Sequence, residues 1–219
     1  MIELVSVNVG MPVDLGVHQG TRVLSGIRKR PVTESMVQVS TLNIAGDGQG
    51  DLVAHGGVDK AIFAYPRSHL TAWAVEFGQA EPFRYGNIGD NLTIGNLDET
   101  DVCIGDIWRW GEVRLQISQP RYPCYKLGMA VGDPIMVKRF MATGRSGWYI
   151  RVLTPGLAPT SGAITIESRD PSGMTVREVA LSAYGEADNV RRQEIAGHPL
   201  LAPAWKKILQ RRMAEPANV

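Results

Sequence analysis

Hydrophobic residues in the first three quarters of the chain occur in short runs separated by Gly, Pro, Asn and Asp. Short runs rich in β-branched residues and bounded by turn formers are typical of β-strands. They predict strands over Ile2–Asn8, Val37–Leu42, Asn91–Ile94, Asp106–Trp110, Val113–Ser118 and Ala163–Ser168. Gly111-Glu112 separates two of these runs and predicts a tight hairpin. Many short strands with few long helices indicate a closed or sandwiched β architecture.

Two helices are predicted to interrupt the strands. Between Ser68 and Gly78, apolar residues repeat with the period of an amphipathic helix, and Ser68 is the expected cap. Asp133-Pro134 has the character of a second helix start, and Gly144 follows the last apolar position of that helix. Both segments are short, so they are expected as insertions in a mainly β domain.

The pattern changes near Arg169. Pro171-Ser172-Gly173 has the composition of a linker, and Thr175 with Glu178 has the spacing of a capping box. Further helices are predicted from Asn189 to Ala196 and from about Leu201 to Met213. We therefore predict a β domain over residues 1–168 and a small three-helix domain over residues 169–219.

Charge and composition limit the functional classes to which the protein can belong. The chain has 23 Lys and Arg against 22 Asp and Glu, so no global field favours nucleic acid or a membrane surface. The opening MIELVSVNVG lacks the parts of a signal peptide, and no apolar run approaches the roughly 20 residues of a membrane span. We expect a soluble cytoplasmic protein.

The segment SQPRYPCYKL holds the most reactive candidate, Cys124. Pro120 and Pro123 stiffen the backbone before it, and Arg121 and Lys126 supply positive charge on either side. Neighbouring cations favour the thiolate, which is the form of cysteine that binds metals and attacks electrophiles. A nucleophile, a redox sensor and a metal ligand all remain open from this segment alone.

A second candidate constellation lies in LVAHGGVDKAIFAYP. Gly56 and Gly57 permit unusual backbone conformations and close approach of a ligand, and His55 and Lys60 bring donors beside them. A solvated Gly-Gly turn is an equally good interpretation of the same residues.

Two further segments carry candidate ligand groups. Lys29 and Arg30 belong to a run of three cations, which is more often a solvated strand edge than a phosphate site. The GNIGDNLTI run offers Asp90 and Asn91, or only a turn before a strand. Cys103 has apolar neighbours and is expected as a small core residue rather than a metal ligand.

Taken together, several segments resemble the MOSC domain family, in its bacterial YiiM-like branch. The resemblance rests on stretches that occur in family order between about residues 25 and 155. They are GIRKRPV, GDGQGDLVAHGGVDKAIFAYP, GNIGDNLT, VCIGDIWRWGE, ISQPRYPCYKL and GRSGWYIRVL. One departure is Asp90, where this branch usually has Glu, so the carboxylate is shorter by one methylene.

The resemblance implies a β-barrel of the pyruvate-kinase-barrel-like kind that binds molybdenum cofactor in its molybdopterin form. Cys124 matches the family's cysteine and is the expected molybdenum ligand, which suits a soft thiolate. The anionic pterin phosphate needs cations and N–H donors. The sequence offers Lys29, Arg30, His55, Gly56, Gly57 and Lys60 for the phosphate, and further candidates for pterin contacts are Asn91, Arg121, Arg145 and Arg151.

The implied activity is reduction of N-hydroxylated compounds, notably purine bases such as 6-hydroxylaminopurine, with Asp90 or His55 delivering a proton. The chain has no GxGxxG and no iron–sulfur cysteine set, so a separate flavoprotein is the expected electron donor. Two alternatives stay open, a carrier of molybdenum cofactor or sulfur without reductase activity and a cofactor-free binding module. The sequence leaves open whether the chain forms a homodimer.

Overall fold

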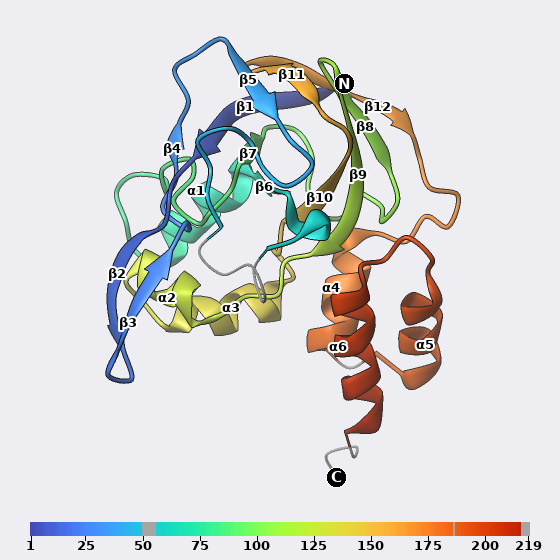
Figure 1. The fold of residues 1–219 in the computed structure, drawn as a ribbon. Helices are drawn as coiled ribbons and strands as arrows, with labels where there is room; N and C mark the ends of the chain where they lie inside the picture. The colour runs from blue at the N-terminus through green and yellow to red at the C-terminus, as the bar shows by residue number, and fades with distance from the viewer. Residues whose placement is uncertain (50–55, 186, 216–219) are drawn as a thin grey trace.

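A closed β-barrel forms the centre of the protein (Figure 1). The computed structural model describes residues 1–49, 56–185 and 187–215. The barrel strands are β1 (Ile2–Val9), β6 (Ile62–Pro66), β7 (Leu92–Ile94), β8 (Ile107–Trp110), β9 (Val113–Pro120), β10 (Trp148–Thr154) and β12 (Gly162–Ser168). They follow the order β12-β8-β9-β10-β6-β7-β1, and β12 also pairs with β1. Closure leaves this sheet without the exposed edges of an open sheet.

Large side chains fill the barrel. Trp108, Trp110 and Trp148 are fully buried, and the rings of Trp108 and Trp148 meet edge to face with centroids 5.9 Å apart. Burying a large apolar side chain contributes about 1.5–3 kcal/mol. The hairpin expected at Gly111-Glu112 is confirmed, because Trp110 pairs with Val113 on either side of it. The sequence-based prediction of a mainly β barrel is therefore confirmed.

Several strands were not predicted. The barrel strands β6 and β10 were missed, and all residues of β6 are buried, so that strand lacks the alternation that identifies a half-exposed strand. The others lie outside the barrel ring, where short or exposed strands carry weak patterns. They are β2 (Val13–His18), β3 (Thr21–Ser25), β4 (Arg30–Pro31) and β11 (Gly156–Pro159), whereas β5 (Met36–Val39) overlaps the strand predicted over Val37–Leu42.

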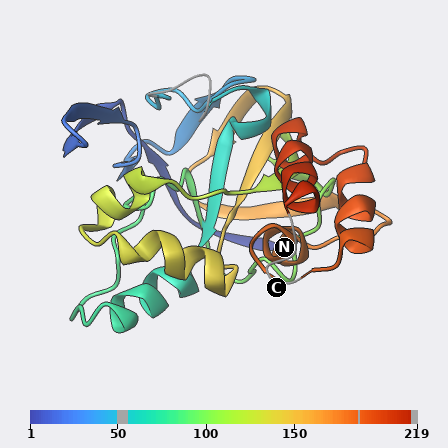
Figure 2. The same cartoon turned by 90° about the horizontal axis from the view of Figure 1, so that it is seen from below.

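One group of helices packs below one side of the barrel (Figure 2). It consists of α1 (Arg67–Glu76), α2 (Tyr125–Val131) and α3 (Ile135–Thr143), and the 3-10 helix η1 (Val58–Lys60) precedes β6. Leu70, Trp73 and Phe140 join these helices in a second apolar cluster. The expectation that Ser68 caps α1 was wrong, because Pro66 at the end of β6 occupies the cap position. Helix α2 was not predicted.

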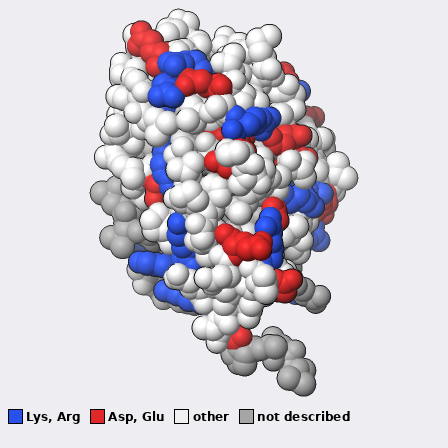
Figure 3. Space-filling model, turned by 90° about the vertical axis from the view of Figure 1, so that its right-hand side faces the viewer, with Lys and Arg blue, Asp and Glu red and all other residues white. Residues whose placement is uncertain are grey.

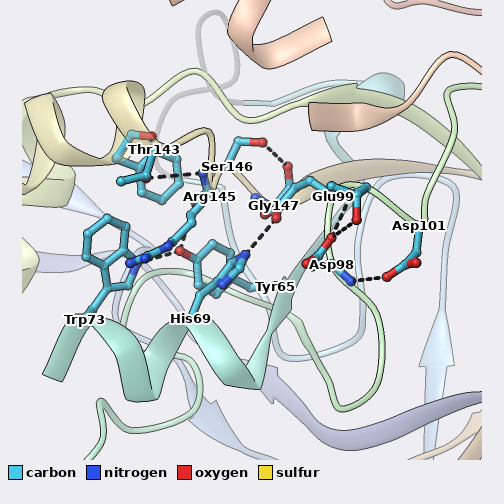
Figure 4. Close-up of polar contacts among 12 residues, drawn as sticks. Tyr65, His69, Trp73, Asp98, Glu99, Asp101, Thr143, Arg145, Ser146 and Gly147 are labelled. Atoms are coloured by element: carbon cyan, nitrogen blue, oxygen red, sulfur yellow. Dashed lines mark hydrogen bonds and ion pairs between the residues drawn. The ribbon is translucent and has the colours of Figure 1, made fainter. Parts of the chain in front are cut away.

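A buried polar network fixes the loop before β10 onto α1 (Figure 4). Glu99 accepts a hydrogen bond from the Gly147 N–H (2.6 Å) and pairs with His69 Nε2 (2.7 Å). The Tyr65 hydroxyl donates to the Arg145 carbonyl (3.0 Å) and accepts from Trp73 Nε1 (2.7 Å). Buried polar groups that satisfy one another in this way rigidify a fold. The network therefore fixes the start of β10 against helix α1.

The C-terminal helices lie on the other side of the barrel (Figure 2). They are α4 (Val176–Tyr184), α5 (Asn189–Gly197) and α6 (Pro203–Ala214). Thr175 caps α4 as expected, since its Oγ1 accepts from the Glu178 N–H (3.1 Å). Trp205 and Leu209 of α6 are fully buried in the same apolar cluster as the barrel interior. The division into domains 1–168 and 169–219 stays a prediction, because the two parts share this core.

Candidate functional site

Cys124 lies in the connection between β9 and α2, and it lines a cavity. Four cationic residues line the same cavity: Lys29, Lys60, Arg121 and Lys126. Asp47 is the one acidic residue among the described lining residues. The cavity therefore combines a thiol with an excess of positive charge, which favours an anionic ligand.

Lys29 and Asp47 form a buried ion pair in the cavity wall. Their side chains are 7% and 3% exposed, and Lys29 Nζ donates to Asp47 Oδ1. Asp47 also accepts from the Gly10 N–H (3.0 Å) and from Asn91 Nδ2 (3.0 Å). Burial lowers the pKa of Lys29, against the opposing attraction of Asp47. The ion pair and Asn91 therefore form one hydrogen-bonded wall of the cavity.

Arg121 is held in a single orientation. It is 7% exposed, its guanidinium donates to the Ile88 carbonyl, and it lies 4.8 Å from the centroid of the Phe63 ring. A guanidinium over an aromatic face gains cation–π energy, and its planar fork carries more N–H donors than the one bond to Ile88 uses. These contacts leave Arg121 positioned to meet an anion in the cavity.

Tyr149 of β10 also lines the cavity, and sequence reasoning did not identify it. Burial raises the pKa of its phenol, with a smaller opposing effect of Arg121 and a further increase from Cys124. The phenol is therefore neutral at physiological pH and keeps its proton. The GRSGWYIRVL stretch contains the residue, but nothing in that stretch says that its side chain faces Cys124.

Asp90 is fully buried and does not line the cavity. Its Oδ2 accepts from Thr93 Oγ1 (2.7 Å), the Gly86 N–H (3.1 Å) and Asn8 Nδ2 (3.2 Å). Its Oδ1 has no hydrogen-bond partner within the described part of the chain. Burial raises the pKa of Asp90, and the hydrogen bond from Thr93 opposes the change. In this position the carboxyl holds the turn that carries Asn91.

The raised pKa of Asp90 predicts a pH-dependent contribution to stability. The folded protein binds this proton more tightly than the unfolded chain, so the contribution is present below the unfolded pKa of about 4. It is lost as pH rises through the raised, folded pKa. We expect the excess in unfolding free energy of wild type over Asp90→Asn to fall between pH 4 and pH 8, measured by urea denaturation.

Asp98→Asn is the matched control for this measurement. Burial raises the pKa of Asp98, but hydrogen bonds from Thr100 outweigh it and lower the pKa overall. The contribution of Asp98 is therefore complete above its unfolded pKa of about 4, so the excess of wild type over Asp98→Asn should stay nearly constant over the same pH range. A difference between wild type and Asp90→Asn that stays constant with pH would contradict the assignment.

The other candidate residues lie apart from the cavity. Arg30 is exposed on β4, and Gly56 and Gly57 do not line the cavity, although Gly57 has the unusual φ of 97° expected of it. Arg151 pairs with Asp59 and donates to the Leu200 carbonyl (2.8 Å).

Arg145 pairs with Glu76 and lies over the Trp73 ring, so it belongs to the polar network below the barrel (Figure 4). His55 falls outside the described residues. Of the cofactor candidates, Lys29, Lys60, Asn91, Arg121 and Cys124 share one cavity.

Neither cysteine forms a disulfide. Cys103 is half-buried rather than a full core residue, and burial raises the pKa of its thiol. Within the described ranges, no three His, Cys, Asp or Glu side chains are grouped to hold a metal ion. In that same part of the chain, no helix has the length and apolar character needed to cross a membrane.

Comparison with known proteins identifies the family. The MOSC domain model matches residues 51–167. The uncharacterized protein YflK of Bacillus subtilis is 38% identical over 93% of this chain and 90% of its own length. The crystal structure of YiiM from Geobacillus stearothermophilus is 33% identical, covers 97% of this chain and 100% of that chain, and has a TM-score of 0.80.

A third relative, a protein of Gibberella moniliformis named Reductase, is 37% identical over 63% of this chain and 24% of its own length. Because a family model matches more than half of the chain and YiiM shares its whole architecture, this chain belongs to the MOSC domain family and is a YiiM-like member of it.

Proposed function

We propose that this protein holds molybdenum cofactor and reduces N-hydroxylated compounds, in particular N-hydroxylated purine bases such as 6-hydroxylaminopurine. The observation that carries the proposal is the position of Cys124 in a cavity lined by four cations. Membership of the MOSC family and the name of the fungal relative, Reductase, support the oxidoreductase class.

The donor set of the cavity fits this cofactor. A thiolate is a suitable ligand for a thiophilic metal, and Cys124 supplies one. A pterin phosphate is an anion, and Lys29, Arg121 and Lys126 line the same cavity. Gly26 lets the backbone approach closely there, because a Cβ on it would lie 2.2 Å from the Gly48 carbonyl oxygen. Both glycines line the cavity and leave backbone surface open to a ligand.

Each residue then has a role that follows from its surroundings. When bound, the cofactor supplies two-electron redox chemistry. Cys124 ligates the metal, and the Lys29–Asp47–Asn91 wall fixes the orientation of the pterin. Tyr149 keeps a neutral hydroxyl beside Cys124 and can donate a hydrogen bond to the oxygen of the N–OH group. Asp90 acts by positioning Asn91, and His55 stays a candidate proton donor.

Electrons come from a separate protein in this proposal. The sequence contains neither a dinucleotide-binding GxGxxG nor a cysteine set for an iron–sulfur cluster. A flavoprotein reductase is the class of partner that delivers electrons to such a site.

The proposal is tested by comparing protein purified from a host that makes molybdenum cofactor with protein from a cofactor-deficient host. We expect 6-hydroxylaminopurine reduction, driven by reduced methyl viologen, only with the first preparation. Molybdenum and pterin content are measured on both. A preparation that contains the cofactor but reduces none of several N-hydroxylated bases would instead identify a carrier. Absence of molybdenum and pterin from both would rule out either role.

A further inference from the structure

A groove of about 880 Å³ lies beside the cavity and shares Lys60, Cys124 and Tyr149 with it. The cavity itself is small, about 90 Å³, and its cations are assigned to the cofactor in the proposed function. The groove is within the range of about 300–1,000 Å³ that is typical of small-molecule sites. Because Cys124 borders both spaces, a molecule in the groove would lie beside the residue that would hold the metal.

One face of α6 forms the far wall of this groove. Its lining residues, together with the C-cap Glu215, follow the i, i+3, i+4, i+7 pattern of one helix face: Ala204, Lys207, Ile208, Arg211 and Arg212. This spacing places them on a single stripe of the helix. Figure 3 shows the side of the molecule that carries the C-terminal helices, and Lys and Arg side chains gather low on the left of that face.

Two cations of the stripe are available to a ligand. Arg212 is already engaged, because it donates to the Ala183 carbonyl (2.8 Å) and to Glu215 (2.8 Å). Lys207 and Arg211 are exposed and have no ion pair or hydrogen bond from their side chains among the residues that the structure describes. They lie one helical turn apart, about 6 Å along the axis, so both can contact one phosphate group.

The end of the groove near Cys124 has different chemistry. Tyr122 is 40% exposed, and its ring packs on Trp205 with centroids 6.2 Å apart. An exposed aromatic ring is a stacking surface for a planar base. Gln119 and Trp205 line this end and are nine-tenths buried or more, yet Gln119 Oε1 and Trp205 Nε1 have no partner within the described residues. Unpartnered acceptors and donors of this kind are uncommon in native proteins.

We infer that the groove binds the substrate as a nucleotide, with the base on Tyr122 near Cys124 and the phosphate between Lys207 and Arg211. The inference rests on the proposed function for the reaction, but the binding itself needs no turnover. It gives α6 a role in substrate recognition and extends the substrate class from free N-hydroxylated bases to their phosphorylated forms.

Titration calorimetry on the full-length, cofactor-loaded protein tests this with adenine, adenosine and adenosine 5′-monophosphate as probes. We expect the monophosphate to bind about tenfold or more tightly than adenosine, since a charge-assisted contact contributes that much. Lys207→Ala and Arg211→Ala should each reduce this gain, and the double variant should abolish it. Lys206→Ala removes the same charge from α6 outside the groove and should leave the gain unchanged.

Equal affinities for the three probes, or no measurable binding of any, would overturn the inference. So would a phosphate gain that survives in the Lys207→Ala/Arg211→Ala variant. Thermal unfolding of each variant checks that these exposed substitutions leave the fold intact. Molybdenum content and 6-hydroxylaminopurine turnover are measured on the same samples. In the wild-type protein, turnover of the base without nucleotide binding would reject the groove alone, whereas nucleotide binding without turnover would reject the proposed reaction alone.

Discussion

Cys124→Ser should lose nearly all molybdenum from protein purified from a cofactor-competent host. Serine keeps the size of the side chain but replaces a soft thiolate with a hard hydroxyl that stays protonated at neutral pH. The cations of the cavity remain, so some pterin can still bind while the metal is lost. Molybdenum per polypeptide, measured by inductively coupled plasma mass spectrometry, should fall more than about tenfold, as expected when a ligand worth 1.4 kcal/mol or more is removed. Reduction of 6-hydroxylaminopurine should fall with it.

Cys103→Ser is the matched control for this experiment. Cys103 is also half-buried and outside any disulfide, but it lies opposite Thr175 at the start of the C-terminal helices and does not line the cavity. We expect wild-type molybdenum content and activity in this variant. If Cys124→Ser retained molybdenum and activity equal to Cys103→Ser, the assignment of Cys124 as a ligand would be wrong.

Lys29→Met should destabilise the protein by about 3–5 kcal/mol, because it leaves the charge of Asp47 buried without its partner. Asp47 is 3% exposed on its side chain, and among the described residues its carboxylate keeps its contacts to the Gly10 N–H and Asn91 Nδ2 alone. Methionine retains the length and apolar stem of lysine, so the change removes charge rather than volume. Urea denaturation of cofactor-free protein measures the effect independently of ligand binding.

A double variant distinguishes the cost of leaving one buried charge unpaired from the cost of losing the packing of the two side chains. Lys29→Met/Asp47→Leu removes both charges, so it should lose less stability than the sum of the two single changes. The exposed pair between Arg114 and Glu167 provides the comparison, since Arg114→Met should leave the denaturation midpoint nearly unchanged. Additive losses for Lys29 and Asp47 would show that the two side chains do not interact in the folded protein.

Local sequence patterns predicted those elements whose defining residues lie close together in the chain. The alternating run Val113–Ser118, the Gly111-Glu112 turn and the Thr175 cap depend on residues within a few positions of one another, and the structure has each of them. Strand β6 and helix α2 were missed because complete burial and short length remove the pattern that identifies them.

For the site, the sequence by itself determined the reactive groups: a thiol on a stiff loop and cations in several motifs. Only the tertiary structure decided which of them meet. It brings Lys29, Asn91 and Arg121 to the cavity of Cys124, and it places Arg30 and Arg151 elsewhere. Tyr149 and the α6 groove had no local signal, because strand register and helix docking alone set the direction of their side chains. Contacts between residues far apart in the chain arise from barrel closure, and closure depends on every strand at once.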